Sequence, residues 1–245
     1  MKRFIYFCIA LVMCTGNAKA LENEPEEGLT WMGLFGMNIS KLLNHEYNAK
    51  VGATMGIRAD YVLPKAHGTY ITAGIDWTMK GSKLTKAMPV AGQTLDVTGK
   101  YCLHYFEIPV RVGFRYNVKE NIGLYGEMGP YFAVGVGGRH KCCIDGDGSA
   151  IRKAEDDGTF CAFDKTDDVV RQTFQRWDAG VGLRLGMEFN KHYNLMFGFD
   201  WGLADIYRDS LRDLYWDTKQ METGAGERLP KVYNFNFSLA FGYRF

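Results

Sequence analysis

The sequence predicts an all-β fold: an eight-stranded, antiparallel, up-and-down transmembrane β-barrel with short periplasmic turns and long extracellular loops. Eight segments alternate apolar residues with polar or small ones at a period of two, which is the side-chain period of a β-strand. Each segment has eleven or more residues, whereas a tilted membrane strand needs about 9–11 and a typical soluble strand has about 5–6. The connections between the segments also alternate, long and then short.

The first four segments begin the alternation. Their apolar parity carries residues such as Trp31, Ile57, Ile75 and Ile108, and their other parity is small, polar or charged. Residues 101–105, just upstream of the fourth segment, fit the opposite parity better, which predicts a β-bulge near His104 or Tyr105. These four segments are residues 29–40, 51–62, 69–80 and 106–116.

The last four segments complete an even strand count. In the second of them every second residue from Trp177 to Phe189 is apolar, and in the last one the apolar parity runs from Tyr233 to Phe245 at the end of the sequence. These segments are residues 122–137, 176–189, 193–204 and 232–245.

Charged residues occupy only the polar parity of the eight segments. A lipid-facing Arg or Lys at mid-bilayer costs roughly 2–4 kcal/mol, so a membrane barrel would turn these charges inward. Seven basic and seven acidic residues then predict a salt-bridged, structural lumen. An alternative is that Glu107 with Glu127, or Asp178 with Asp200, forms an acid/base pair. The inward set is Arg58, Asp60, Asp76, Lys80, Glu107, Arg111, Arg115, Glu127, Arg176, Asp178, Arg184, Glu188, Asp200 and Arg244.

Aromatic residues near segment ends fit the two lipid interfaces of a membrane barrel. The expected interfacial set is Trp31, Tyr61, Tyr116, Trp177, Tyr193, Tyr243 and Phe245. Outer-membrane barrels join their strands by short periplasmic turns and longer outside loops. Here the long connections are 41–50, 81–100, 138–175 and 205–231, and the short ones are 63–68, 117–121 and 190–192. This alternation predicts that both termini are periplasmic.

The N-terminus has the three parts of a secretory signal peptide. Lys2 and Arg3 are followed by an apolar core, residues 4–14, and by the small-x-small pattern of residues 18–20. The expected organisation is a signal peptide at 1–20, a short periplasmic segment at 21–28 and the barrel at 29–245. Cleavage leaves 26 basic and 28 acidic residues, a balance without the basic surface that binds nucleic acid.

The long connection 138–175 contains three of the four cysteines that follow the signal peptide. Cys142 or Cys143 is expected to form a disulfide with Cys161, and Cys102 could take the remaining thiol, since an exported protein favours disulfides. Two alternatives are zinc binding by His140 with the cysteines and a weak calcium-loop match over residues 145–156. We expect no cofactor and no metal.

Four stretches and the C-terminus resemble a known family. FEIPVRVGFRY, YGEMGPYFAVGVGG, WDAGVGLRLGMEF, FDWGLADI and the terminal FGYRF are similar to the outer-membrane β-barrel domain proteins of the Bacteroidota, the PorT-like group. Glu107-Ile108-Pro109 matches the family's fourth-strand pattern, and Gly129-Pro130 matches its fifth. The resemblance implies a monomeric, eight-stranded outer-membrane barrel and brings no catalytic residues.

The expected function is that of an integral outer-membrane protein with a structural, adhesive or envelope- and secretion-accessory role, not an enzyme. Its expected partners are outer-membrane lipid, lipopolysaccharide, the barrel-assembly machinery and an envelope protein bound through loops 138–175 and 205–231. Alternatives are a narrow passive channel, a lipid-modifying barrel enzyme, and a soluble barrel that holds a ligand. No Ser-His nucleophile motif supports the enzyme.

Overall fold

The computed structural model describes residues 27–43, 47–90, 93–145, 160–161, 163, 174–207 and 231–245. The predicted signal peptide, residues 1–20, lies outside this part of the chain. Nine strands are present in it, and no helix in it is long and apolar enough to span a membrane. The strands are β1 (Gly28–Leu43), β2 (Tyr47–Val62), β3 (Thr69–Val90), β4 (Gln93–Lys119), β5 (Ile122–Asp145), β6 (Phe160–Cys161), β7 (Trp177–Phe189), β8 (Tyr193–Gly202) and β9 (Tyr233–Arg244).

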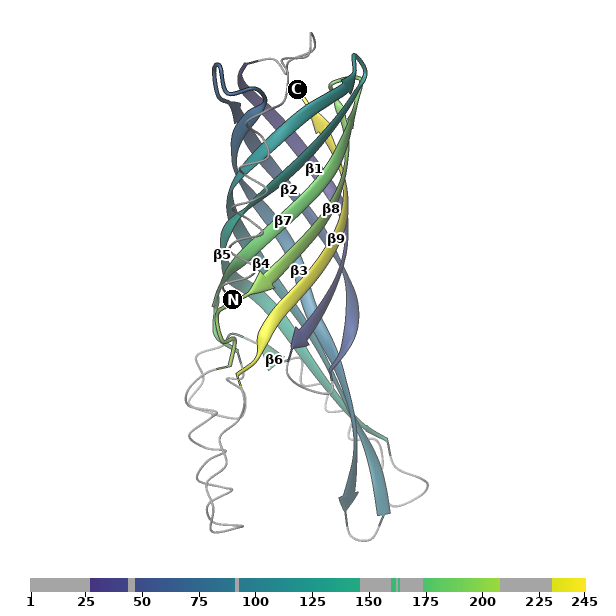
Figure 1. Ribbon diagram of the computed structural model, residues 1–245. Helices are drawn as coiled ribbons and strands as arrows, with labels where there is room; N and C mark the ends of the chain where they lie inside the picture. Colours follow the sequence, from purple (N-terminus) through teal and green to yellow (C-terminus); the bar gives the residue numbers. More distant parts are fainter. Residues whose placement is uncertain are drawn as a thin grey trace, which may run out of the picture.

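Eight of these strands close into an antiparallel barrel (Figure 1). The sheet runs β4-β3-β2-β1-β9-β8-β7-β5, and pairing of β4 with β5 joins its two ends. β6 has two residues and pairs with the outer part of β5. Closure removes the free edges that an open sheet would present to lipid, where unpaired backbone groups find no partner. The predicted fold class is therefore confirmed.

The barrel wall has its apolar side chains on the outside and its charged side chains on the inside, the reverse of a soluble barrel. Phe35, Ile57 and Phe132 on the outside are 66%, 62% and 62% exposed, whereas Arg111 and Glu107 on the inside are each 1% exposed. Every second side chain of β7 and β8 is buried. This pattern is the one that the parity of the sequence predicts for a membrane barrel.

The short turns lie at one end of the barrel, which we call the periplasmic end, and the opposite end is the outer end. The periplasmic ends of the strands match the predicted segments within about three residues, and so do the outer ends of β1, β7, β8 and β9; the outer ends of β2 to β5 do not. The connection predicted at 81–100 is wrong as a loop, because β3 continues to Val90 and β4 begins at Gln93. Likewise β1 and β2 extend into the predicted loop 41–50, and β5 extends to Asp145.

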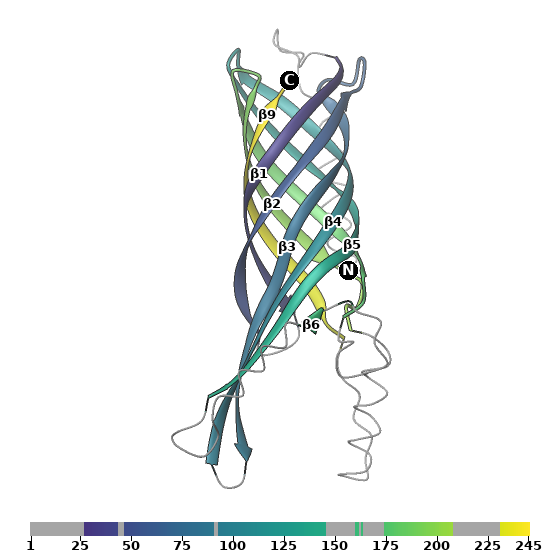
Figure 2. The ribbon, with the colours of Figure 1, turned by 180° about the vertical axis from the view of Figure 1, so that it is seen from behind.

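These extensions form an arm, defined as β3 from Gly81, β4 to Lys100 and β5 from Arg139. Figure 2 shows the arm leaving the rim and projecting beyond the barrel. The backbone pairs Lys83 with Lys100 in β3–β4 and Gly99 with Cys142 in β4–β5. The strands continue through this region, but it contains too few apolar residues for strands to be predicted there from a period of two alone.

The bulge predicted near His104 or Tyr105 is present, but its extra residue lies on the neighbouring strand. The β4–β5 register shifts between His104 and Tyr105, which pair with Gly137 and Gly135, so that Val136 of β5 has no partner. β4 itself keeps its parity, and Tyr101, Leu103 and Tyr105 therefore point into the barrel. The apolar parity of residues 101–105 therefore faces the lumen and does not reflect a bulge in β4.

The seam between β1 and β9 depends on a glycine. A Cβ placed on Gly36 would overlap the carbonyl oxygen of Leu239 and lie 2.6 Å from the Cα of Ala240. At Gly33, three residues earlier on β1, the nearest atom to such a Cβ is Cε2 of Phe245 at 3.9 Å. Only the first position therefore requires the absence of a side chain.

We expect Gly36→Ala to impair barrel closure, because backbone atoms of β9 would have to move. The fraction of folded protein after refolding into lipid vesicles is measured by the shift in gel mobility between unboiled and boiled samples. Gly33→Ala is the matched control and should refold like the native protein. Equal folded fractions for the two variants would contradict the seam constraint.

Candidate functional site

The lumen is the most distinctive chemical environment of the described chain. It contains six basic and seven acidic side chains, each at most 6% exposed. The predicted balance of seven and seven was wrong by one residue, since Arg176 precedes β7, is exposed, and donates to the carbonyl oxygen of Phe163 at 3.1 and 3.3 Å. The lumen therefore carries one excess carboxylate.

A periplasmic group of four charges lies where β2, β4, β7 and β9 end. Arg115 contacts Asp60 at 3.2 Å and Glu188 at 3.5 Å, and Arg244 contacts Asp60 at 3.0 Å and also pairs with Glu188. The guanidinium carbon of Arg115 lies 4.9 Å from the ring centroid of Tyr70. Two cations and two carboxylates make this group neutral.

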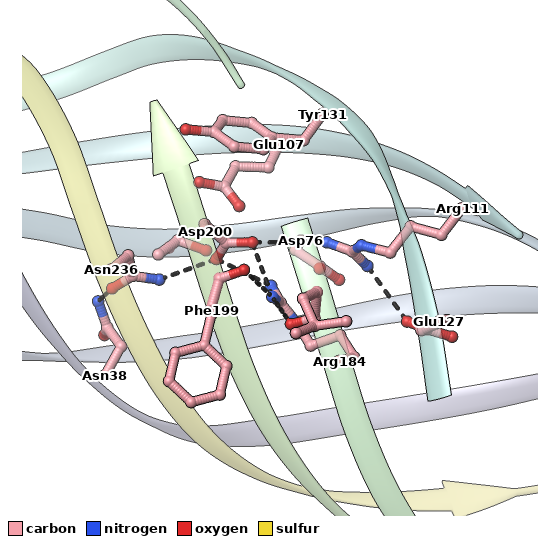
Figure 3. A network of polar contacts seen from close by, with 12 residues as sticks. Asn38, Asp76, Glu107, Arg111, Glu127, Tyr131, Arg184, Phe199, Asp200 and Asn236 are labelled. Carbon is pink, nitrogen blue, oxygen red and sulfur yellow. Dashed lines mark hydrogen bonds and ion pairs between the residues drawn. The ribbon is translucent and has the colours of Figure 1, made fainter. Parts of the chain in front are cut away.

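A central group links three arginines with three carboxylates; Figure 3 shows Arg111 and Arg184 of this group with its carboxylates. Arg58 contacts Asp76 at 2.7 Å and Glu127 at 3.2 Å. Arg111 lies between Glu127, at 3.4 Å, and Asp200, at 3.8 Å. Because Glu127 and Asp200 each contact two of the arginines, the group forms one connected network across the barrel.

Arg184 and Asp200 form the tightest pair of the central group. Nη1 and Nη2 of Arg184 donate to the two carboxylate oxygens of Asp200 at 2.7 and 2.9 Å. Asn236 donates to the same carboxylate at 3.1 Å and accepts a hydrogen bond from Asn38 at 2.7 Å. Bidentate pairs of this kind fix orientation as well as charge.

The outer group holds the excess carboxylate. Nζ of Lys80 lies 2.6 Å from Glu107 and 3.0 Å from Asp178, so one cation serves two carboxylates. Asn234 donates to Asp178 at 2.9 Å, and the Tyr131 hydroxyl donates to it at 3.5 Å. Lys80 also lies 4.7 Å from the ring centroid of Tyr131.

An apolar cap fills the outer end of the lumen beyond Lys80. Phe163 and Phe174, from the connection between β5 and β7, are 4% and 0% exposed and belong to this cap. Backbone hydrogen bonds hold the segment in place, from Gln175 N–H to the Ile206 carbonyl and from Gly135 N–H to the Arg176 carbonyl. The cap consists of Leu42, Tyr101, Leu103, Tyr105, Tyr131, Ala133, Phe163, Phe174, Ile206, Tyr207 and Val232.

The sequence contained little signal for the cap. Phe163 ends a short apolar run, residues 160–163, and Phe174 is flanked by polar residues, and no strand periodicity marks either of them. Asn38 and Asn236 were also missed, although both lie on the polar parity of predicted strands. Uncharged polar residues at inward positions were the available signal for these two.

The lumen offers no arrangement that matches the proposed acid/base pairs. Glu107 and Asp178 contact Lys80, Glu127 contacts Arg58 and Arg111, and Asp200 contacts Arg184. The two proposed pairs are thus each divided between the outer and central groups. No group of three or more His, Cys, Asp or Glu side chains that could hold a metal ion occurs among the described residues.

The predicted cysteine site lies mostly outside the described side chains. The backbone of Cys142 and Cys143 belongs to β5 and that of Cys161 to β6, which pairs with Arg139 and His140. Cys102 on β4 is a free thiol in this structure. Residues 146–156, most of the calcium-loop match, are not described.

The predicted interfacial aromatics all lie on the outside of the barrel wall, facing away from the lumen. Tyr193, Tyr243 and Phe245 contact one another at the periplasmic end, with centroid distances of 5.5 and 5.2 Å. Trp177 is at the outer end and is 68% exposed. Trp31, Tyr61 and Tyr116 are 52%, 45% and 39% exposed.

We expect Arg184→Met to lower the free energy of unfolding by about 3–5 kcal/mol, because Asp200 loses its bidentate partner while it stays buried. Adding Asp200→Asn should recover part of that loss. Urea unfolding in lipid vesicles, followed by tryptophan fluorescence, measures both. Lys119→Met at an exposed position is the control. A double variant less stable than Arg184→Met alone would contradict this account.

Among solved structures, the chain is similar at low sequence identity to several outer-membrane proteins. Neisserial surface protein A has 12% identity and a TM-score of 0.43, over 89% of this chain and 100% of that one. The attachment invasion locus protein Ail of Yersinia pestis has 13% identity and a TM-score of 0.37, over 90% and 100%. OprG of Pseudomonas aeruginosa has 10% identity and a TM-score of 0.39, over 91% and 98%.

No match was found among curated proteins. The model of the family described as "Outer membrane protein beta-barrel domain" matches residues 21–208, well over half of the chain. The matched residues include strands β1 to β8 of the closed barrel described above. The chain therefore belongs to the outer membrane protein β-barrel domain family and is a protein of the outer membrane.

Proposed function

We propose that the protein is a non-enzymatic, non-conducting outer-membrane anchor that displays its arm outside the cell, in an adhesive, structural or envelope- and secretion-accessory role. The observation that carries this proposal is the extension of β3, β4 and β5 beyond the rim (Figure 2). β4 has 27 residues, whereas crossing the membrane needs about 9–11. The residues of β4 that exceed this length are not needed to cross the membrane and therefore have another role.

The ion pairs and the cap support a barrel without a continuous water path. Six basic and seven acidic buried side chains form the periplasmic, central and outer groups along the lumen, and the apolar cap follows them. An eight-stranded barrel is only wide enough to be filled by side chains. A passive channel would have to displace both the pairs and the cap.

The lumen also supports a non-enzymatic role. Each of its seven carboxylates contacts at least one arginine or lysine, so none is left as a free acid or base. We include in the proposal the finer assignments of the sequence: the PorT-like group of the Bacteroidota, a monomer, insertion by the barrel-assembly machinery, and a partner bound through residues 138–175 and 205–231. These rest on the resemblance and on the length of those connections.

We expect no single-channel conductance from the native protein in planar bilayers, since its lumen is filled by paired charges and the cap. A variant that shortens the cap side chains, Phe163→Ala with Phe174→Ala, tests whether the cap matters; the charged groups beneath it should still prevent ion flow. A porin in the same bilayers is the positive control. Steady conductance by the native protein would favour the channel instead.

We expect a barrel without the β3–β4 hairpin of the arm to fold but to fail in the cell. Residues 84–99 are replaced by Asn-Gly, which joins the opposed Lys83 and Lys100 by a two-residue hairpin turn. The variant should keep the gel shift on boiling yet not restore the adhesion or envelope phenotype of a deletion strain. Replacement of periplasmic turn residues 64–67 by a turn of equal length is the control. Full complementation by the barrel without this hairpin would contradict the display role.

A further inference from the structure

Two neighbouring strands bring three sulfur and nitrogen ligands together on the outside of the barrel wall. β3 and β4 run side by side where they pass the outer end of the barrel (Figure 2). Met79 of β3 pairs directly with His104 of β4, and Cys102 is the next outward-facing residue of β4. All three side chains are half-buried, and Cys102 is a free thiol. We call these three residues the thiol patch.

The spacing of the thiol patch suits a single ion. Directly opposed residues of an antiparallel pair have Cβ atoms about 4.5–5.5 Å apart, and diagonal neighbours are about 7–8 Å apart. Residues two apart on one strand are separated by about 6.8 Å. The long side chains of Met79 and His104 cover these separations by rotation about their own bonds. One thiol, one thioether and one imidazole can therefore meet around one ion without movement of the backbone.

The neighbours of the thiol patch orient its histidine and leave its cysteine without a directly opposed side chain. The ring of His104 stacks on that of Trp77, with a centroid distance of 5.5 Å and an interplanar angle of 15°. This contact holds the imidazole against the wall. The residue that pairs with Cys102 on β3 is Gly81, and the stem of Lys50 lies over this glycine.

The charges around the thiol patch are cations. Lys50 donates from Nζ to the carbonyl oxygen of Tyr101 at 3.0 Å, and Arg139 of β5 pairs with Cys102. Burial, and then the nearby Lys50 and Arg139, lower the pKa of His104. A histidine whose pKa is lowered stays neutral at neutral pH, so a ring nitrogen of His104 keeps the lone pair that a metal ion needs.

These surroundings favour a soft monovalent ion over a divalent one. The outward-facing residues of β3 at 77–83 and of β4 at 100–106 include no carboxylate, whereas Ca²⁺ and Mg²⁺ require oxygen ligands. Structural Zn²⁺ sites almost always use four ligands from Cys, His and carboxylates, and methionine is not one of them. A divalent ion would also add two charges next to Lys50 and Arg139.

We propose that Cys102, His104 and Met79 bind one Cu⁺ ion at the outer end of the barrel. Thiolate and thioether sulfur select Cu⁺, and imidazole also suits copper. On binding, the thiol of Cys102 releases its proton to the solvent as the Cu–S bond forms, and copper stays Cu⁺ because no electron is transferred. Thiolate and ion together are neutral. This activity goes beyond the display role and does not depend on it.

The sequence led us to expect no metal, because nothing local joins the three ligands. Cys102 and His104 are only two residues apart, but Met79 lies on another strand and reaches them through the β3–β4 register. A thioether is also a ligand that a search for histidines, cysteines and carboxylates does not consider.

Titration of the detergent-solubilised barrel with Ag⁺, a soft monovalent probe without redox chemistry under these conditions, tests the proposal. The samples carry Cys142→Ser, Cys143→Ser and Cys161→Ser, which leaves Cys102 as the one thiol after residue 20. Native mass spectrometry should count one tightly bound Ag⁺ per chain, with release of one proton. In the chain with all its cysteines, Cys102→Ser should bind one Ag⁺ fewer than the native protein.

Single variants in the same background test the three ligands. We expect Cys102→Ser, His104→Gln and Met79→Leu each to weaken Ag⁺ binding by about 10- to 100-fold or more, since even residues outside the ligand shell of a metal contribute this much. Met55→Leu, at an exposed outward-facing methionine of β2, is the matched control and should bind like the background. The gel shift on boiling confirms that each variant has folded.

Two results would overturn the proposal. If only Cys102→Ser weakens binding, the ion is held by an isolated thiol and there is no three-ligand site. If Zn²⁺ binds as tightly as Ag⁺, the assignment to a soft monovalent ion is wrong. Loss of affinity in all three variants, together with weak Zn²⁺ binding and an anaerobic titration in which Cu⁺ follows Ag⁺, would support it.

Discussion

The pairing of charges inside the barrel is the interaction on which the rest of the structure depends. Lipid offers no partner to a charge or to an unpaired backbone group, so the wall must be closed and its polar side chains must face one another. Lys80 with Glu107 and Asp178, and Arg184 with Asp200, satisfy this condition at 2.6–3.0 Å. The outward surface can then be wholly apolar over the membrane.

Space for these pairs comes from small residues on the neighbouring strands. A Cβ at Gly182 would lie 2.7 Å from Oδ1 of Asp200, and one at Gly198 would lie 2.6 Å from Nε of Arg184. An eight-stranded barrel has little interior volume, so a guanidinium in the lumen requires a position with no side chain beside it. The abundance of glycine and the buried arginines are thus two parts of one packing solution.

Strands within the membrane were predictable, and structure beyond it was not. The alternation of apolar and polar residues identified segments 69–80 and 176–189. It arises because one side of each strand faces lipid and the other faces the polar lumen. Outside the bilayer this pressure ends, and β3 could continue to Val90 without a lipid-facing apolar parity. The parity of 101–105 misled for a related reason: Leu103 and Tyr105 are apolar because they enter the cap, not because they face lipid.

Candidate-site residues followed the same division. The inward position of Arg58, Asp76 or Glu188 could be inferred from strand parity alone, whereas the partner of each could not, because pairing depends on register and tilt. Arg176 was misassigned since it lies at a strand end, where parity no longer determines direction. Phe174 is buried because the chain around it folds back over the lumen. No local sequence pattern predicts this.

The ion pair between Asp60 and Arg244 joins residues 184 positions apart, on β2 and on the last strand. Arg115 contacts both Asp60 and Glu188. Before β9 is in place this single arginine faces two carboxylates, and Arg244 supplies the second cation. A nascent wall that stops short of β9 would therefore expose uncompensated charge to the bilayer. Insertion is consequently expected to be a late, all-or-none event, and chains that lack their final strand should be cleared by proteolysis before they ever reside in the membrane.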